Sequence, residues 1–121
     1  MRVLVWAGVA LLGGLGALLR FAVDGAIAER AGSEFPWGTM AVNLSGAFVL
    51  GLLAGFALHG DALLLAGTAV LGSYTTFSTW IFETHRLAEE GEPWPAALNI
   101  VLSLALGIGA AALGRTIGGA L

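Results

Sequence analysis

Four apolar runs without charged residues constrain the fold of this 121-residue chain more than any other feature. They extend over Val3–Leu19, Phe35–Leu58, Ala62–Phe82 and Pro93–Gly114. A helix needs about 20 apolar residues to cross a bilayer, so each run has roughly the length of one membrane span. The connections are too short to hold a further domain. We therefore predict one all-α membrane domain, residues 1–121, with four transmembrane helices at about 3–28, 35–58, 62–90 and 93–118.

Composition narrows the function classes further. Apolar residues make up 58% of the chain, the net charge is −3 and lysine is absent, so nucleic acid and anionic lipid surfaces are not expected partners. Cysteine is also absent, which excludes disulfides, thiolate metal sites and cysteine nucleophiles. We expect no enzyme activity, and we expect the function to lie inside the bilayer.

The arginines divide evenly between the two ends of the predicted bundle. If the helices alternate, Arg2 and Arg115 lie on one side and Arg30 and Arg86 on the other, with Arg20 near the end of the first helix. Arginine and lysine in cytoplasmic loops normally set the orientation. An even division permits insertion both ways and an antiparallel homodimer, and one weakly preferred orientation is the equally weighted alternative.

Small residues spaced four apart predict close helix packing. Gly51 and Gly55 form such a pair in the second predicted helix, and Gly107 and Ala111 form one in the fourth. The pattern is common in membrane bundles and supports close association only weakly.

The third run carries six hydroxyl side chains in seven residues, from Ser73 to Thr79. One or two hydroxyls can bond to carbonyls a turn back in a helix, but six at the centre of a span are costly. Glycine and β-branched residues at this depth predict a broken helix whose halves meet near Gly72–Thr76. The freed carbonyls suit a dehydrated monovalent cation shared by two copies, or neighbouring helices satisfy them without an ion. The residues leave both interpretations open.

Neutral polar side chains form stripes on the neighbouring predicted helices. Thr39, Asn43 and Gly46 share one face of the second, and Asn99 and Ser103 lie one turn apart in the fourth. Interhelical hydrogen bonds explain any single residue of this kind, whereas three polar helices together indicate a solute path. Its hydroxyl, amide and ring-edge donors suit a small hard anion, and they also suit water or a small neutral solute.

Three motifs resemble the Fluc (CrcB) family of fluoride channels, and the similarity extends over nearly all of the chain. The motifs run from Gly13 to Phe21 (GGLGALLRF), from Gly38 to Phe48 (GTMAVNLSGAF) and from Gly72 to Trp80 (GSYTTFSTW). The third is highly specific. The resemblance implies an antiparallel, dual-topology homodimer with two fluoride pores, a broken third helix and a structural sodium ion (Na+) at the dimer centre.

The resemblance also implies roles for particular residues. The backbone carbonyls of Gly72 and Thr75 would bind the sodium ion. The Asn43 amide would donate toward the ion path, and the ring edge of Phe77 would face fluoride. The other candidates for the pore or for fluoride binding are Thr39, Ser78, Thr79, Trp80, Asn99 and Ser103.

The sequence departs from the family pattern at Trp80, where a second pore-facing phenylalanine is typical. An indole is larger and adds an N–H donor, so slower conduction or a different ring placement is expected. Asn99 stands where a tyrosine is often found. Arg20 resembles the family's arginine near the end of the first helix, where it anchors that end or draws anions to a vestibule.

Together these features predict passive export of fluoride across the bacterial inner membrane, which relieves fluoride toxicity. The expected partners are fluoride, a second copy of the chain and the lipid bilayer. The main alternative is a small proton-coupled multidrug-type antiporter, which needs a carboxylate inside the membrane. Asp24 is the nearest candidate, and we expect it at a helix end. A non-transporting scaffold subunit is the third possibility.

Overall fold

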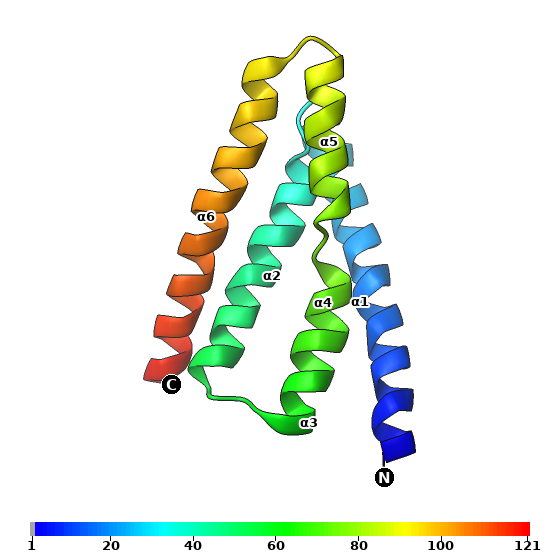
Figure 1. Cartoon of the computed structure of the whole chain (residues 1–121), viewed down its shortest axis with the longest axis vertical. Helices are drawn as coiled ribbons and strands as arrows, with labels where there is room; N and C mark the ends of the chain where they lie inside the picture. Colours follow the sequence, from blue (N-terminus) through cyan, green and yellow to red (C-terminus); the bar gives the residue numbers. More distant parts are fainter. Residues whose placement is uncertain (1) are drawn as a thin grey trace.

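The computed structural model describes residues 2–121, which form an all-helical bundle (Figure 1). Three helices are long and apolar enough to cross a membrane: α1 (Arg2–Ala31), α2 (Trp37–Gly55) and α6 (Pro93–Ala120). The third predicted span consists of shorter elements, namely α3 (Gly60–Leu63), the π-helix η1 (Leu64–Leu71), α4 (Gly72–Tyr74) and α5 (Ser78–Glu89). Across residues 2–121 there is no strand, and the predicted all-α class is confirmed.

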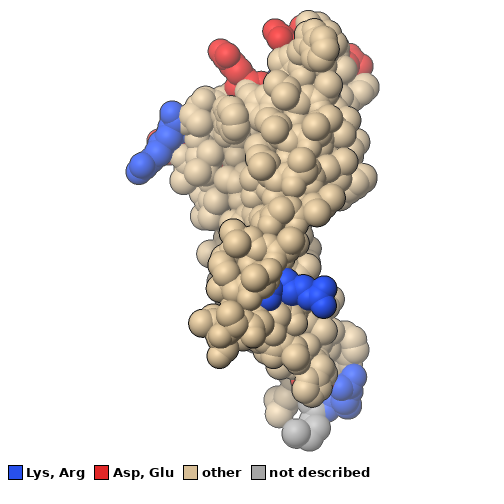
Figure 2. Space-filling view, turned by 90° about the vertical axis from the view of Figure 1, so that its left-hand side faces the viewer, with Lys and Arg blue, Asp and Glu red and all other residues tan. Residues whose placement is uncertain are grey.

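The segments run up and down, so both chain ends lie at the same end of the bundle (Figure 1). The connection between α2 and α3 lies there too, and Arg2 Nη1 pairs with Asp61 Oδ1 at 3.4 Å. Of the eight acidic residues, Asp61 alone belongs to this end. Figure 2 shows acidic side chains gathered mainly at the opposite end and a largely uncharged surface along the bundle, as expected for a surface that faces lipid.

Glycine and proline set several helix ends. α1 ends at Ala31 because Gly32 has a φ of +84°, a left-handed conformation that glycine adopts without strain. Gly91, with a φ of +76°, ends the α5 segment in the same way. Pro93 then begins α6, where its fixed φ suits the first helical position and its missing N–H costs nothing.

Other glycines let α2 and α6 pack backbone against backbone. A Cβ atom on Gly51 would collide with the carbonyl oxygen of Ala111 in α6. Gly55, Gly114 and Gly118 lie equally close to the backbone of the facing helix. The small residues of the second and fourth runs therefore serve the close approach of two helices within one protomer.

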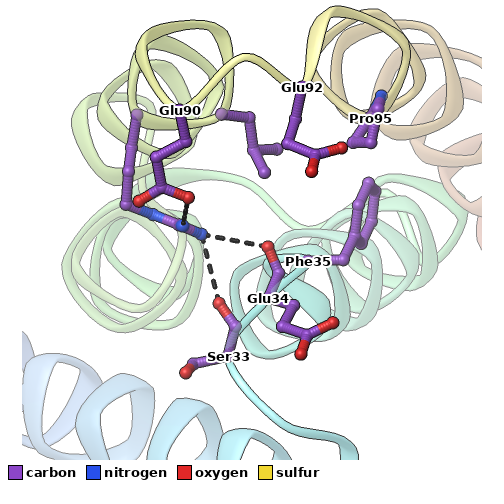
Figure 3. Close-up of a pocket in the computed structure, with 8 residues that line it drawn as sticks. Ser33, Glu34, Phe35, Glu90, Glu92 and Pro95 are labelled. Carbon is purple, nitrogen blue, oxygen red and sulfur yellow. Dashed lines mark hydrogen bonds and ion pairs between the residues drawn. The ribbon is translucent and has the colours of Figure 1, made fainter.

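Arg86 ties α5 to the connection between α1 and α2. Figure 3 shows Glu90 together with Ser33 and Glu34 of that connection. Its guanidinium pairs with Glu83 at 2.7 Å and with Glu90 at 2.9 Å. Its Nη2 also donates to the carbonyl oxygens of Ser33 at 3.1 Å and Glu34 at 3.3 Å. Arg86, Glu90, Ser33 and Glu34 line a cavity of about 400 Å³ at the acidic end. Because Arg86 is already paired with two carboxylates, it serves as a structural tie and not as a free cationic group.

Gly51→Ala tests the packing of α2 against α6. The added methyl group meets a backbone carbonyl that cannot move aside, so we expect the free energy of unfolding to fall by about 1–3 kcal/mol. Gly109→Ala in α6 is the matched control, because nothing lies within 4 Å of its added Cβ. Thermal unfolding of both purified variants in one detergent measures the difference. Equal stability of the two variants would contradict the close approach of these helices.

Candidate functional site

Residues 75–77 separate α4 from α5 in the middle of the third segment. Thr75 has an extended backbone (φ −75°, ψ 157°), whereas Gly72 is still helical. The N–H and the Oγ1 of Thr75 both bond to the Leu71 carbonyl oxygen at 2.9 Å, which ends the preceding turn. The non-helical stretch therefore lies toward the C-terminal side of the predicted interval, Gly72–Thr76.

Asn43 on α2 holds this interruption through its side-chain amide. Its Oδ1 accepts a hydrogen bond from the Thr76 N–H at 2.8 Å, and its Nδ2 donates to the Thr76 carbonyl oxygen at 2.9 Å. The Asn43 amide thus replaces the hydrogen-bond partners that the N–H and the carbonyl oxygen of Thr76 would have in a continuous helix. Asn43 is expected to donate toward the ion path. One of its two amide hydrogens is bonded to the Thr76 backbone, so only the second is available to an ion.

Gly46, one turn along α2 from Asn43, allows the two segments to approach. A Cβ atom there would collide with Cγ2 of Thr75 and would lie 3.3 Å from Cδ2 of Tyr74. The Ser45 and Tyr74 hydroxyl oxygens are 2.9 Å apart and form a second link between α2 and α4. The stripe predicted on α2 is therefore a contact surface for the interrupted segment.

Thr76 was not among the residues predicted for the site. It is buried, and its Oγ1 accepts a hydrogen bond from the Thr79 N–H at 3.2 Å and donates to Thr79 Oγ1 at 3.1 Å. The first of these bonds satisfies an amide in the first turn of α5 from the residue just before its N-cap, Phe77. The available signal was the position of a threonine just before a helical pattern.

Gly72 and Thr75 are among the residues whose carbonyl groups lose their helical partners at the interruption. In a continuous α-helix, Thr76 N–H would bond to the Gly72 carbonyl and Thr79 N–H to the Thr75 carbonyl. Here Asn43 Oδ1 and Thr76 Oγ1 accept these hydrogens instead. Gly72 and Thr75 also line an open cavity of about 380 Å³. Within the described chain no group of three His, Cys, Asp or Glu side chains could hold a metal, so only neutral oxygens are offered here.

Arg20, Thr39 and Thr79 line one cavity of about 210 Å³ between α1, α2 and α5, together with Asp24 and Thr76. Hydroxyl groups and one guanidinium therefore face a common space. Arg20 and Asp24 both lie inside α1, which continues to Ala31.

Asp24 lies at the start of the second helix. A Cβ atom on Gly38, in the first turn of α2, would collide with the Asp24 carboxylate. A carboxylate beside a helix N-terminus is favourably placed, because the helix dipole is positive there. Asp24 therefore has a structural explanation.

Trp80, Asn99 and Ser103 form a second group, between α5 and α6. Asn99 is fully buried, and Trp80 Nε1 donates to its backbone carbonyl oxygen at 3.1 Å. The extra N–H donor expected from the indole is thus already bonded within the protomer. Asn99 Oδ1 and Ser103 Oγ are buried and find no hydrogen-bond partner in residues 2–121.

Phe77 and Ser78 are exposed on the protomer surface, although the Ser78 hydroxyl oxygen lies 3.4 Å from Thr76 Oγ1. The Phe77 side chain is 72% exposed, and its ring meets Trp80 in an edge-to-face contact, with centroids 5.7 Å apart and planes at 78°. Such pairs are favourable because the positive edge of one ring meets the negative face of the other. One protomer therefore does not gather all predicted pore residues around a single space.

Comparison of the sequence with those of known proteins identifies the family of this chain. The sequence model of the family described as CrcB-like protein, Camphor Resistance (CrcB), matches residues 7–115. A fluoride-specific ion channel FluC 2 of Mycolicibacterium paratuberculosis is 59% identical over 113 residues, 93% of each chain. The FluC 2 protein of Mycobacterium tuberculosis is 53% identical over 117 residues, 97% of this chain and 93% of the relative.

A more distant relative is similar over most of its length. The fluoride-specific ion channel FluC of Geobacter sulfurreducens is 42% identical over 103 residues, 81% of this chain and 83% of the relative. These relatives carry the names of channels and not of enzymes. Since the family match covers most of the sequence, this multi-pass membrane protein belongs to the CrcB-like family.

Proposed function

We propose that this chain is a fluoride-selective channel of the bacterial inner membrane, through which fluoride leaves the cell down its gradient. The observation that carries the proposal is the set of neutral donors around residues 75–77, in a chain whose relatives are named fluoride-specific ion channels. Fluoride is small and hard, and N–H, O–H and ring-edge donors can replace its water shell. The one carboxylate that lines the 210 Å³ cavity, Asp24, lies beside the start of α2, and this structural place favours passive flow over coupled transport.

Each group of residues has a distinct role in this proposal. Arg20 draws the anion to the 210 Å³ cavity, where the hydroxyls of Thr39 and Thr79 donate to it. The second amide hydrogen of Asn43 and the ring edge of Phe77 then replace water molecules around the ion. Ser103 Oγ, which has no partner within residues 2–121, supplies a further donor on α6.

We further propose that two antiparallel copies complete the pathway. Phe77 is a large apolar side chain that is 72% exposed beside a polar interruption, and the cavity at Gly72 and Thr75 opens to the protomer surface. A second copy would cover both. The balanced arginines favour the antiparallel arrangement, because they allow insertion both ways.

A sodium ion fits the carbonyl oxygens of Gly72 and Thr75. Both oxygens have lost their helical partners, both belong to residues that line one open cavity, and neutral oxygens suit a monovalent cation. When bound, the ion would supply positive charge to carbonyls that are otherwise poorly satisfied in the membrane. Ligation from two copies would join the protomers at their centre.

A proton-coupled antiporter is the less favoured function. It requires a membrane-embedded carboxylate that exchanges its proton with the substrate. Asp24 is the carboxylate that lines the 210 Å³ cavity, and its place beside the start of α2 already explains it. If Asp24→Asn abolished transport, the antiporter would become the better explanation.

Efflux from liposomes tests the proposed function. Liposomes that hold the purified chain and are loaded with potassium fluoride should lose fluoride rapidly once valinomycin balances the charge. Liposomes loaded with chloride should lose almost none, because the larger anion cannot replace its water shell with these donors. Equal rates for the two anions, or no fluoride efflux, would contradict the proposal.

Phe77→Ile tests the place of this ring in the pathway. Isoleucine is apolar but has no positive ring edge, so we expect fluoride efflux to fall at least about tenfold, equivalent to roughly 1.4 kcal/mol in the barrier. Phe82→Ile is the matched control, since Phe82 is 63% exposed on α5 and has no assigned role in the pathway. Full activity of the Phe77→Ile variant would remove this ring from the pathway.

Removal of sodium tests the cation site separately. In buffers where a large organic cation replaces all sodium, we expect less cross-linked dimer and slower fluoride efflux, and sodium should restore both. Lithium should restore them less well, because its ionic size differs. If complete removal of sodium changed neither the dimer fraction nor the efflux rate, that result would contradict a bound ion at Gly72 and Thr75.

A further inference from the structure

We infer that Asn99 is a positioning residue, which fixes the Trp80 ring beside Phe77 and so sets the ring edges that meet the ion. This inference rests on the fluoride-channel function proposed above. It concerns two positions at which this chain departs from the pattern of the family that it resembles. The evidence is a reciprocal set of hydrogen bonds between α5 and α6.

Two hydrogen bonds join Trp80 and Asn99. In each, the side chain of one residue donates to the backbone carbonyl oxygen of the other. The Trp80 indole Nε1 donates to the Asn99 backbone carbonyl oxygen at 3.1 Å. In return, Asn99 Nδ2 donates to the Trp80 backbone carbonyl oxygen at 3.4 Å, a long bond, and to Thr84 Oγ1 at 2.9 Å. Thr84 Oγ1 in turn donates to the Trp80 carbonyl oxygen at 2.9 Å.

This cluster is the polar connection between the two helices. Within residues 2–121, every hydrogen bond that joins α5 to α6 involves Asn99. The Asn99 side chain is fully buried, so water does not compete for these hydrogen bonds. Loss of the amide would leave the indole bond to the Asn99 backbone carbonyl oxygen as the remaining polar link between α5 and α6 among the described residues.

The amide is oriented by its nitrogen. Asn99 Oδ1 has no partner among the described residues, so the bonds of Nδ2 to Thr84 and Trp80 decide which way the side chain faces. They hold the α5 backbone at Trp80 against α6. That placement brings the indole N–H to the Asn99 carbonyl oxygen and fixes the plane of the ring.

The orientation of the Trp80 indole determines how the Phe77 ring packs against it. Phe77 lies outside α5 and is mostly exposed, and its intramolecular aromatic contact is the edge-to-face pair with Trp80. An edge-to-face pair keeps its geometry only while the second ring is held. Asn99 therefore acts on the pathway through Trp80 and touches no ion itself.

A double-mutant cycle tests this inference. Asn99→Leu keeps the number and branching of the side-chain heavy atoms and removes both Nδ2 bonds. With Trp80 present it should lower fluoride efflux about tenfold, whereas in a Trp80→Phe background, which lacks the indole N–H, it should lower efflux less than about twofold. A contact that merely joins α5 to α6 would lower efflux by the same factor in both backgrounds, and that result would overturn the inference.

Thr84 offers a matched pair of variants. Thr84→Val has the shape of threonine but lacks the oxygen that accepts the Asn99 bond, so it should reproduce the loss of efflux. Thr84→Ser keeps the hydroxyl and should conduct like the natural chain. Equal efflux from the valine and serine variants would count against the inference.

Proton exchange of the indole gives a readout that does not depend on transport. In protein labelled with indole-¹⁵N tryptophan, the Trp80 signal is the one that disappears in Trp80→Phe. Its exchange with D₂O should accelerate about tenfold in Asn99→Leu, while the Trp37 and Trp94 signals stay unchanged. Unchanged exchange at Trp80 would overturn the inference. Absence of fluoride efflux from the natural chain would instead refute the proposed function, and the exchange rate would still decide whether Asn99 holds the ring.

Discussion

The bond pair between the Asn43 amide and the Thr76 backbone is the interaction on which the rest of the structure depends. A bilayer offers no water to backbone groups, so a segment can leave the helical conformation at this depth only if other groups take over its hydrogen bonds. Asn43 does so for Thr76, and Thr76 Oγ1 does so for the Thr79 N–H. Without these substitutes the third segment would be expected to remain one helix.

The same bonds create the chemistry of the site. Each amide that turns to a side chain leaves a carbonyl without its helical partner, and those carbonyls belong to Gly72 and Thr75. The hydroxyl donors of Thr39, Thr76 and Thr79 line a different cavity. One local interruption thus separates oxygen acceptors, which suit a cation, from neutral donors, which suit an anion. This separation explains how a chain without a charged residue at its centre can serve an anion.

The sequence predicts much of this arrangement, because hydropathy and short connections leave few alternatives. The hydroxyl-rich third run and the polar stripe of Thr39, Asn43 and Gly46 belong to the two segments that the Asn43–Thr76 bonds join. The position of the non-helical residues could not be predicted, because it depends on which amide of the third segment reaches Asn43 on another helix. The bonded indole of Trp80 could not be foreseen for the same reason, since its acceptor lies on α6. The contact of Asp24 with the start of α2 could not be predicted either, because it depends on how α1 packs against that helix.

The central claim is that a second, inverted copy completes the ion path, and orientation-locked chains test it most directly. Lysines added near His59 would fix one orientation, and lysines added near Gly32 would fix the other, because positive residues stay in the cytoplasm. Fluoride efflux from cells that lack other fluoride exporters should appear only when both versions are produced together. Full efflux from either version alone would contradict the claim.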